Sequence, residues 1–334
     1  MPSLLDMPDL AMRLILEKSD FRSIQNLRKS CRDLRLLIED LQPESNCTTF
    51  CIKFGRDFIN SSIYFERGPQ YEKFSIFYRK TDDGGCEIDP CGKVLEDSDF
   101  LSVAFRDAQL LLDSSSLDVF ALLQEQASTP ISELLELLED HLKVRKAALK
   151  VKDFTIEVEK AEQVLCVLPY LDPQELQILN LNFSRFSGTQ EVSATVTRQI
   201  GELAQWKSAT ELHSYNFFKE NIQAENLVHF ETVHLDVNDA VVSWKMVLKL
   251  KEAFLVSPHM KHFQLKYAQC DAEPELERLY GAPFISNFLN QKIWFFAVPE
   301  DPDHAVFIRI NSIYVVIERI EIDEVQEGAI VTGE

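Results

Sequence analysis

The spacing of hydrophobic residues changes along the chain, and the change marks a boundary near residue 43. Before it, apolar residues recur every three or four positions, which predicts short amphipathic helices. Asp20 and Ser30 suit the starts of two of them, and Pro8 suits the first turn of a helix before those. Three helices in about forty residues bury too little apolar surface to be stable alone. We therefore expect residues 1–43 to pack on the rest of the chain or on a partner protein.

After Pro43 apolar and polar residues alternate, which predicts β-strands. The expected strands cover residues 47–54, 61–66 and 73–80, with a turn at 67–69 between the last two. The glycine-containing stretch 81–92 is expected to be a loop, and an amphipathic helix through Leu101 and Leu112 follows it. Residues 44–112 are thus predicted to form a small antiparallel meander with a helix.

A strand-like motif then recurs through the rest of the chain. The leading apolar residues of its six copies are Leu117, Leu149, Leu176, Leu212, Val233 and Phe263, with spacings of 32, 27, 36, 21 and 30. Helical patterns lie between the copies, for example at residues 131–142 and 241–255. A strand and a helix every thirty residues or so are typical of a leucine-rich-repeat-like solenoid, here irregular and without an asparagine ladder.

The predicted fold class is therefore α+β: three N-terminal helices followed by an irregular leucine-rich-repeat-like α/β domain over residues 113–325. A doubly wound sheet is the alternative, although it usually carries a glycine-bearing ligand loop at its switch point. Three apolar segments between residues 293 and 320 read as strands that could cap the repeats. Residues 326–334 are expected to be a frayed acidic tail.

Charge is unevenly distributed. The chain has 34 basic and 54 acidic residues, a formal net charge of −20. Residues 82–140 contribute −13 and residues 271–334 contribute −9, whereas residues 1–81 are at +2. This acidity argues against binding to nucleic acid or to an anionic membrane, and it favours a basic or neutral protein partner over a phosphorylated one.

The sequence contains no motif for nucleotide binding or catalysis. It has 10 glycines, and Gly84-Gly85 is the only adjacent pair, so a phosphate-binding loop is not expected. No H-E-x-x-H, G-x-S-x-G or paired C-x-x-C is present, and we expect neither an enzyme nor a cofactor. Charges interrupt the first twenty residues, and no apolar run is long enough to span a bilayer, which predicts an intracellular protein, cytoplasmic or nuclear.

The seven cysteines are expected to be thiols, because an intracellular compartment is reducing. Cys47 and Cys51 have a spacing that invites a zinc site, but both belong to a predicted strand. Four residues of strand separate two side chains by about 13 Å, whereas thiolates on one zinc each lie at about 2.3 Å from it. The pair His259 and His262 lacks a second pair of ligands, so no metal is predicted.

The first forty residues resemble an F-box, motif by motif. Met7-Pro8 stands where F-box sequences open with Leu-Pro, and Ile15-Leu16 matches the apolar pair seven residues after the proline. The second helix matches at Asp20, Ile24 and Leu27. This sequence departs from the pattern with Leu10 for an acidic residue, Ser19 for leucine, Ser30 for valine and Leu34 for tryptophan.

The remainder resembles the FTH-type domain of a large nematode-type family of F-box proteins. The segments that carry this resemblance are residues 167–181, 204–212 and 227–235. The resemblance implies a substrate-recognition subunit of an SCF-type (cullin-RING) ubiquitin ligase, in which the F-box binds a Skp-type adaptor and the repeat-like domain binds a target protein. A protein-interaction scaffold with a degenerate F-box is the alternative, motivated by Ser19 and Leu34. An unrecognised enzyme is a third.

Two sets of residues are predicted to form binding surfaces. The expected adaptor-binding residues are Met7, Pro8, Ile15, Leu16, Phe21, Ile24 and Leu27. Successive residues of a strand lie on opposite faces, and this alternation predicts which side chains of the repeats point outward. We expect the following outward residues to contribute to target binding: His213, Tyr215, His234, Gln264 and Lys266.

Overall fold

A computed structural model describes most of the chain. The described residues are 7–19, 21–41, 47–67, 70–114, 116–126, 131–184, 192–218, 224–237, 241–286 and 291–332. The chain divides into two compact units, Met1–Glu157 with Cys166–Leu176, and Val158–Leu165 with Gln177–Glu334. Each unit is described by itself below.

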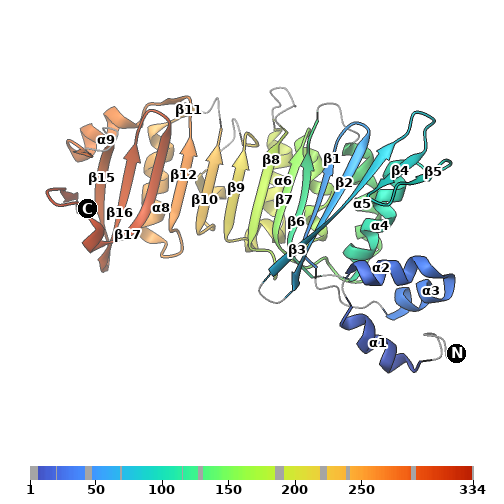
Figure 1. Ribbon diagram of the computed structural model, residues 1–334. Coiled ribbons are helices and arrows are strands. Elements are labelled where there is room, and N and C mark those ends of the chain that lie inside the picture. Colours follow the sequence, from blue (N-terminus) through green and yellow to red (C-terminus); the bar gives the residue numbers. More distant parts are fainter. Residues whose placement is uncertain are drawn as a thin grey trace. The chain divides into compact units, whose positions relative to one another are not determined.

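The first unit begins with three helices, which we call the helical module (Figure 1). They are α1 (Asp9–Glu17), α2 (Phe21–Ser30) and α3 (Arg32–Leu41). Their inward residues form a small core of their own: Met12, Leu16, Ile24, Leu34 and Ile38, with Leu27, Leu37 and Leu41 packed against it. Pro8 is the N-cap of α1, as its lack of a backbone N–H allows.

The rest of the first unit is a sheet with two helices on one face (Figure 1). Its strands are β1 (Cys47–Phe54), β2 (Phe58–Arg67), β3 (Gln70–Lys80), β4 (Cys86–Asp89), β5 (Lys93–Leu95), β6 (Leu117–Gln124) and β7 (Val151–Val158). The helices are α4 (Phe100–Ser114) and α5 (Ile131–Val144), and Leu168–Tyr170 forms a 3-10 turn. The strand order is β7-β6-β1-β2-β3-β4-β5. β1 to β5 pair antiparallel, whereas β7, β6 and β1 are parallel, so the meander and the first repeat strands share one sheet.

The predicted loop at residues 81–92 is partly a strand, because β4 lies inside it. The glycine pair serves the turn before this strand. Gly84 has φ +86°, which favours glycine, and a Cβ on Gly85 would lie 2.6 Å from the backbone oxygen of Leu95. The turn predicted at residues 67–69 and the N-cap predicted at Asp20 lie outside the described residues.

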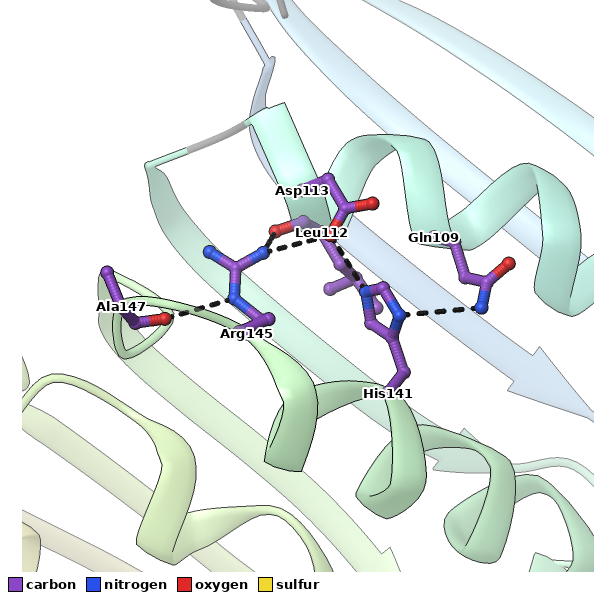
Figure 2. A network of polar contacts seen from close by, with 6 residues as sticks. All are labelled: Gln109, Leu112, Asp113, His141, Arg145 and Ala147. Atoms are coloured by element: carbon purple, nitrogen blue, oxygen red, sulfur yellow. Dashed lines mark hydrogen bonds and ion pairs between the residues drawn. The ribbon is translucent and has the colours of Figure 1, made fainter. Parts of the chain in front are cut away.

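A polar network joins the C-terminal ends of α4 and α5 (Figure 2). Arg145 donates from Nη1 to the backbone oxygen of Leu112 and from Nε to that of Ala147, the latter at 3.2 Å. The same guanidinium lies 3.3 Å from the Asp113 carboxylate, and His141 Nε2 lies 2.9 Å from it. A cation placed on the last carbonyls of a helix also opposes the negative end of its dipole. Arg145 thus holds the two helices together.

The second unit contains the remaining repeats and a three-stranded antiparallel end (Figure 1). Its helices are α6 (Ala194–Glu202), α7 (Ala204–Ser208), α8 (Trp244–Val256) and α9 (Ala272–Tyr280), with 3-10 turns at Ala224–Asn226 and Ile322–Glu324. Its main strands are β8 (Ile178–Phe183), β9 (Glu211–Tyr215), β10 (Thr232–Asp236), β12 (His262–Lys266), β15 (Lys292–Val298), β16 (Asp301–Ile310) and β17 (Tyr314–Glu321). Two-residue strands lie at β11 (Val241–Val242), β13 (Gln269–Cys270), β14 (Phe284–Ile285) and β18 (Val331–Thr332). A 3-10 helix at Ala161–Cys166 lies across the boundary between the units.

The parallel strands of the second unit follow the order of the chain. β8, β9, β10 and β12 are neighbours in that sequence, so they contain no reversal of strand order at which a doubly wound sheet would bind its ligand. Each of the six repeat motifs found in the sequence contains a strand, although the leading residues Leu149 and Leu176 come just before β7 and β8. The leucine-rich-repeat assignment itself stays a prediction.

Antiparallel strands form the C-terminal end of this sheet. β17 pairs with β12, and β16 and β15 follow, as expected of segments that cap the repeats. The outer edge of β15 is covered at one end by β14 and further along by β18, through the pair Phe295 and Val331. The structure therefore differs from the expected frayed tail, because Val331 and Thr332 are paired with a strand.

Candidate protein-interaction surfaces

The helical module leaves several large apolar side chains exposed. Leu10 is 71% exposed, Leu36 53%, Leu14 49% and Met7 44%. Leu10 and Leu14 are four residues apart, so they share one side of α1, and Met7 lies just before Pro8, the N-cap of this helix. Scattered single apolar residues are ordinary on a surface, but a cluster on a 33-residue module indicates an interface.

The predicted adaptor-binding residues divide between surface and core. Met7 and Pro8 are exposed, and Ile15 and Leu27 are half-buried. Leu16 and Ile24 are buried inside the module, where they hold the helices together, so they are not available to a partner in this structure. The side chain of Phe21 lies outside the described part. Sequence matching missed Leu10, Leu14 and Leu36, because a match to a motif does not separate core residues from exposed ones.

The two main departures from the F-box pattern are accommodated within the module. Leu34, in place of tryptophan, is 8% exposed and belongs to the core. Ser19 donates a hydrogen bond from its hydroxyl to the backbone oxygen of Ile15 at 2.7 Å, at the end of α1. Leu34 is therefore packed in the core of the module, and the Ser19 hydroxyl has a hydrogen-bond partner within it.

The second surface is one face of the parallel strands in the second unit. On β17, Arg319 donates to the backbone oxygens of Phe254 and Ser257 in and after α8, so its side chain points toward that helix. Successive residues of a strand alternate between faces. Glu318 therefore points to the other face, where it lies 3.4 Å from His262 Nδ1.

The rings of three histidines form a row across this face, and we call them the histidine ladder (His213, His234 and His262). The ring centroids of His213 and His234 are 4.9 Å apart, and those of His234 and His262 are 4.8 Å apart. These distances match the spacing of neighbouring strands, because His213, His234 and His262 come from β9, β10 and β12.

A carboxylate lies at each end of the ladder. Glu211 is 3.5 Å from His213, and Glu318 is 3.4 Å from His262. His234 lies between two imidazoles, and burial together with those two neighbours lowers its pKa. The hydrogen bond from His262 lowers the pKa of Glu318. The ladder thus favours a neutral central ring between two outer rings that can each pair with an acid.

The five predicted target-binding residues lie together on this face. His213 and His234 are direct partners in register, and Gln264 is the partner of His234 on the next strand. Tyr215, Asp236 and Lys266 form the neighbouring row, in which Lys266 pairs with Asp236 at 3.0 Å. Sequence reasoning missed His262 and Glu318, because nothing in the sequence fixes the register that brings them together.

Three of the seven cysteines are buried, two are half-buried and two are exposed. Cys47 and Cys51 are both buried in β1, and burial raises the pKa of Cys47 to about 12. Among the described residues, no three His, Cys, Asp or Glu side chains are arranged to hold a metal ion. No helix in this described part of the chain has the length and hydrophobicity needed to cross a membrane.

Comparison with known protein families decides the identity of the chain. The F-box domain family matches residues 4–46, and the FTH domain family matches residues 132–283. The chain is an F-box protein with an FTH domain. The F-box match covers the helical module, and the FTH match starts in α5 and ends after α9. No curated protein and no solved structure matches the chain.

These two domains set the general role of the protein. An F-box supports a role in substrate recognition by SCF-type ubiquitin ligases, through binding of a Skp-type adaptor. F-box proteins are generally adaptors rather than enzymes. The F-box and FTH domains thus place this chain in the context of ubiquitin ligases and protein interaction.

Proposed function

We propose that this F-box protein is the substrate-recognition subunit of a cullin-RING ligase, acting in the cytoplasm or nucleus. Its helical module binds a Skp-type adaptor, and the histidine-ladder face of its second unit binds the target protein. The chain itself catalyses no reaction in this proposal, because ubiquitin transfer belongs to other subunits. The observation that carries it is the coincidence of the F-box match with a module that exposes Met7, Leu10, Leu14 and Leu36.

The adaptor interface is argued from burial. A module whose own core already holds Leu16 and Ile24 has four further apolar side chains in water. Burying each large apolar side chain contributes about 1.5–3 kcal/mol. Residues Met7, Leu10 and Leu14 therefore supply the contact, while the buried residues of the motif keep the helices in place.

The target interface is argued from the composition of the ladder face. This face carries several kinds of polar side chain on neighbouring strands. They are the imidazoles of His213 and His234, the phenol of Tyr215, the carboxamide of Gln264 and the ammonium of Lys266. Such groups form hydrogen bonds and stacking contacts, which are typical of protein-recognition surfaces. The residues after position 81 have a net charge of −22, and this favours a basic or neutral target over a phosphorylated one.

Co-purification with a Skp-type adaptor tests the proposal. Full-length wild type is compared with Leu10→Asp and Leu14→Asp, which place a charge on the exposed side of α1. Leu279→Asp is the matched control, because Leu279 is a similarly exposed leucine (42%) on α9 in the second unit. We expect the two α1 variants to lose about tenfold or more in affinity and the control to bind like wild type.

The alternative, a scaffold with a degenerate F-box, gives a different result. In that case a folded wild type fails to capture the adaptor, and neither α1 variant differs from it. Circular dichroism of each variant shows whether the helices remain. The adaptor-binding proposal is abandoned if wild type is folded and does not bind.

A further inference from the structure

A cavity of about 690 Å³ lies in the first unit, between α4 and the strands that α4 crosses. Phe50, Ile63, Ile76 and Tyr78 line it from β1, β2 and β3, and Leu111 lines it from α4. Phe50 and Tyr78 are completely buried, and Ile63 is nearly so. The cavity therefore has an apolar floor that belongs to the core of the sheet.

The cavity is partly open, because the rim residues Arg35 and Arg106 are exposed to solvent. It is also far larger than the voids of a close-packed protein interior, most of which are no larger than a water molecule. Sites for small organic ligands, in contrast, are about 300–1,000 Å³, mostly apolar, and carry a few polar groups that orient the ligand. The volume and lining of this cavity fall in that class.

The charged residues of the lining are mainly cations. Arg28, Arg35, Lys93 and Arg106 line the cavity, against one carboxylate, Asp107. Asp107 already accepts a hydrogen bond from the hydroxyl of Tyr78 at 2.8 Å. Within the described part of the chain, no carboxylate forms an ion pair with Arg35, Lys93 or Arg106. In a protein with a net charge of −20, such a group of cations is complementary to an anion.

We propose that this cavity binds a small amphiphile, with an apolar body in the cavity and a carboxylate at the cationic rim. A guanidinium forms paired, charge-assisted hydrogen bonds with a carboxylate, which an ammonium or a neutral donor does not reproduce. Arg35 comes from α3 and Arg106 from α4, and both line the cavity, so in this proposal the head group lies at the rim between these two helices. The bound molecule then connects the helical module to the sheet, a role separate from adaptor or target binding.

Fluorescence of a dansyl-labelled undecanoate, added to the full-length protein below its micelle concentration, tests the site. The expected result is saturable binding of one molecule per chain, displaced by dodecanoate but not by dodecanol. Arg106→Glu reverses a charge at an exposed position of the rim, and we expect it to weaken binding about tenfold or more. Arg198→Glu, at an exposed arginine of α6, is the matched control and is expected to bind like wild type.

Ala108→Trp fills the cavity from α4 and is expected to abolish binding. Because this change in a buried position can also disturb folding, its helix content is checked by circular dichroism, and Arg106→Glu carries the test independently. The proposal is overturned if no saturable binding is found with wild type. It is also overturned if dodecanol displaces the probe as well as dodecanoate does and Arg106→Glu binds like wild type.

Discussion

The imidazole rings of His213 and His234 stack at 4.9 Å with an interplanar angle of 16°, on neighbouring parallel strands. His262 continues the row on the next strand with its ring tilted by 36°, and Glu211 and Glu318 lie at the two ends of the row. Three adjacent imidazoles cannot all be protonated without repulsion, since like charges at about 5 Å oppose one another. The ladder therefore couples this face of the second unit to pH.

The stability of the second unit is expected to fall as the pH is lowered from 7.5 to 5.5. The pKa of His234 is lowered from its ordinary value of 6.5, so the unfolded chain binds more protons than the folded chain in this range. Glu318 acts at lower pH: its pKa is lowered from 4.5, and its contribution is lost only as the pH falls through that lowered value. Replacing the central ring in His234→Gln should reduce the loss of unfolding free energy between pH 7.5 and 5.5.

Urea unfolding followed by tryptophan fluorescence measures this, because Trp206, Trp244 and Trp294 all lie in the second unit. His259→Gln is the control, at an exposed histidine outside the ladder. An equal loss of stability in wild type and His234→Gln would contradict the prediction.

Arg145→Ala is expected to destabilise the first unit by about 2–4 kcal/mol, because it leaves two backbone oxygens and the Asp113 carboxylate without their shared donor. Arg145→Lys should not restore the loss, since a single ammonium lacks the fork that reaches Leu112 and Ala147 together. Hydrogen exchange at the ends of α4 and α5 is the measurement. Protection in Arg145→Lys equal to wild type would show that charge alone suffices.

Leu34→Trp restores the usual F-box residue, and we expect it to destabilise the helical module rather than strengthen adaptor binding. Leu34 is 8% exposed in a small packed core, and forcing a larger side chain into such a core costs about 1–3 kcal/mol. Thermal melting of the helical signal tests this. Higher adaptor affinity at unchanged melting temperature would show that the tryptophan instead projects toward the partner.

Tyr78→Phe is expected to cost about 1–2 kcal/mol, because the completely buried tyrosine loses its hydrogen bond to Asp107. Burial and the neighbouring Asp107 both raise the pKa of Tyr78, so the phenol stays protonated and its donor is retained across the accessible pH range. Chemical unfolding monitored by circular dichroism provides the value. A double-mutant cycle with Asp107→Asn separates this bond from other effects, and a coupling energy near zero would refute it.

Periodicity predicted the strands well, and it could not predict how they are paired. The alternation in residues 47–54 and in the six repeat motifs indicates which side chains face a core. This property depends only on residues that are close together in the sequence. His262 joins His234 only because β12 lies beside β10 in one particular register, and that register depends on contacts between residues about thirty apart. The ladder was therefore predicted only in part. His213 and His234 were expected to point outward, but the contact with His262 and the carboxylates at the two ends were not predicted.

The same limit explains the short elements and the core of the helical module. β4 lies in a segment of glycine and aspartate that reads as loop, and its partners β3 and β5 supply the hydrogen bonds that make it a strand. Leu16 and Leu10 both look apolar in sequence, but one is completely buried and the other is 71% exposed. Only the packing of three helices against one another separates them.

β15 has the composition of an aggregation-prone segment. Its seven residues, from Lys292 to Val298, include Trp294, Phe295 and Phe296 and a single charge. An uncovered strand of this kind is a template for fibril growth through its free backbone groups. β14 and β18 cover that edge with two residues each. Deleting residues 330–334 removes β18 and leaves the backbone of Phe295 and Phe296 unpaired at the edge, so we expect the shortened protein to self-associate through these two residues.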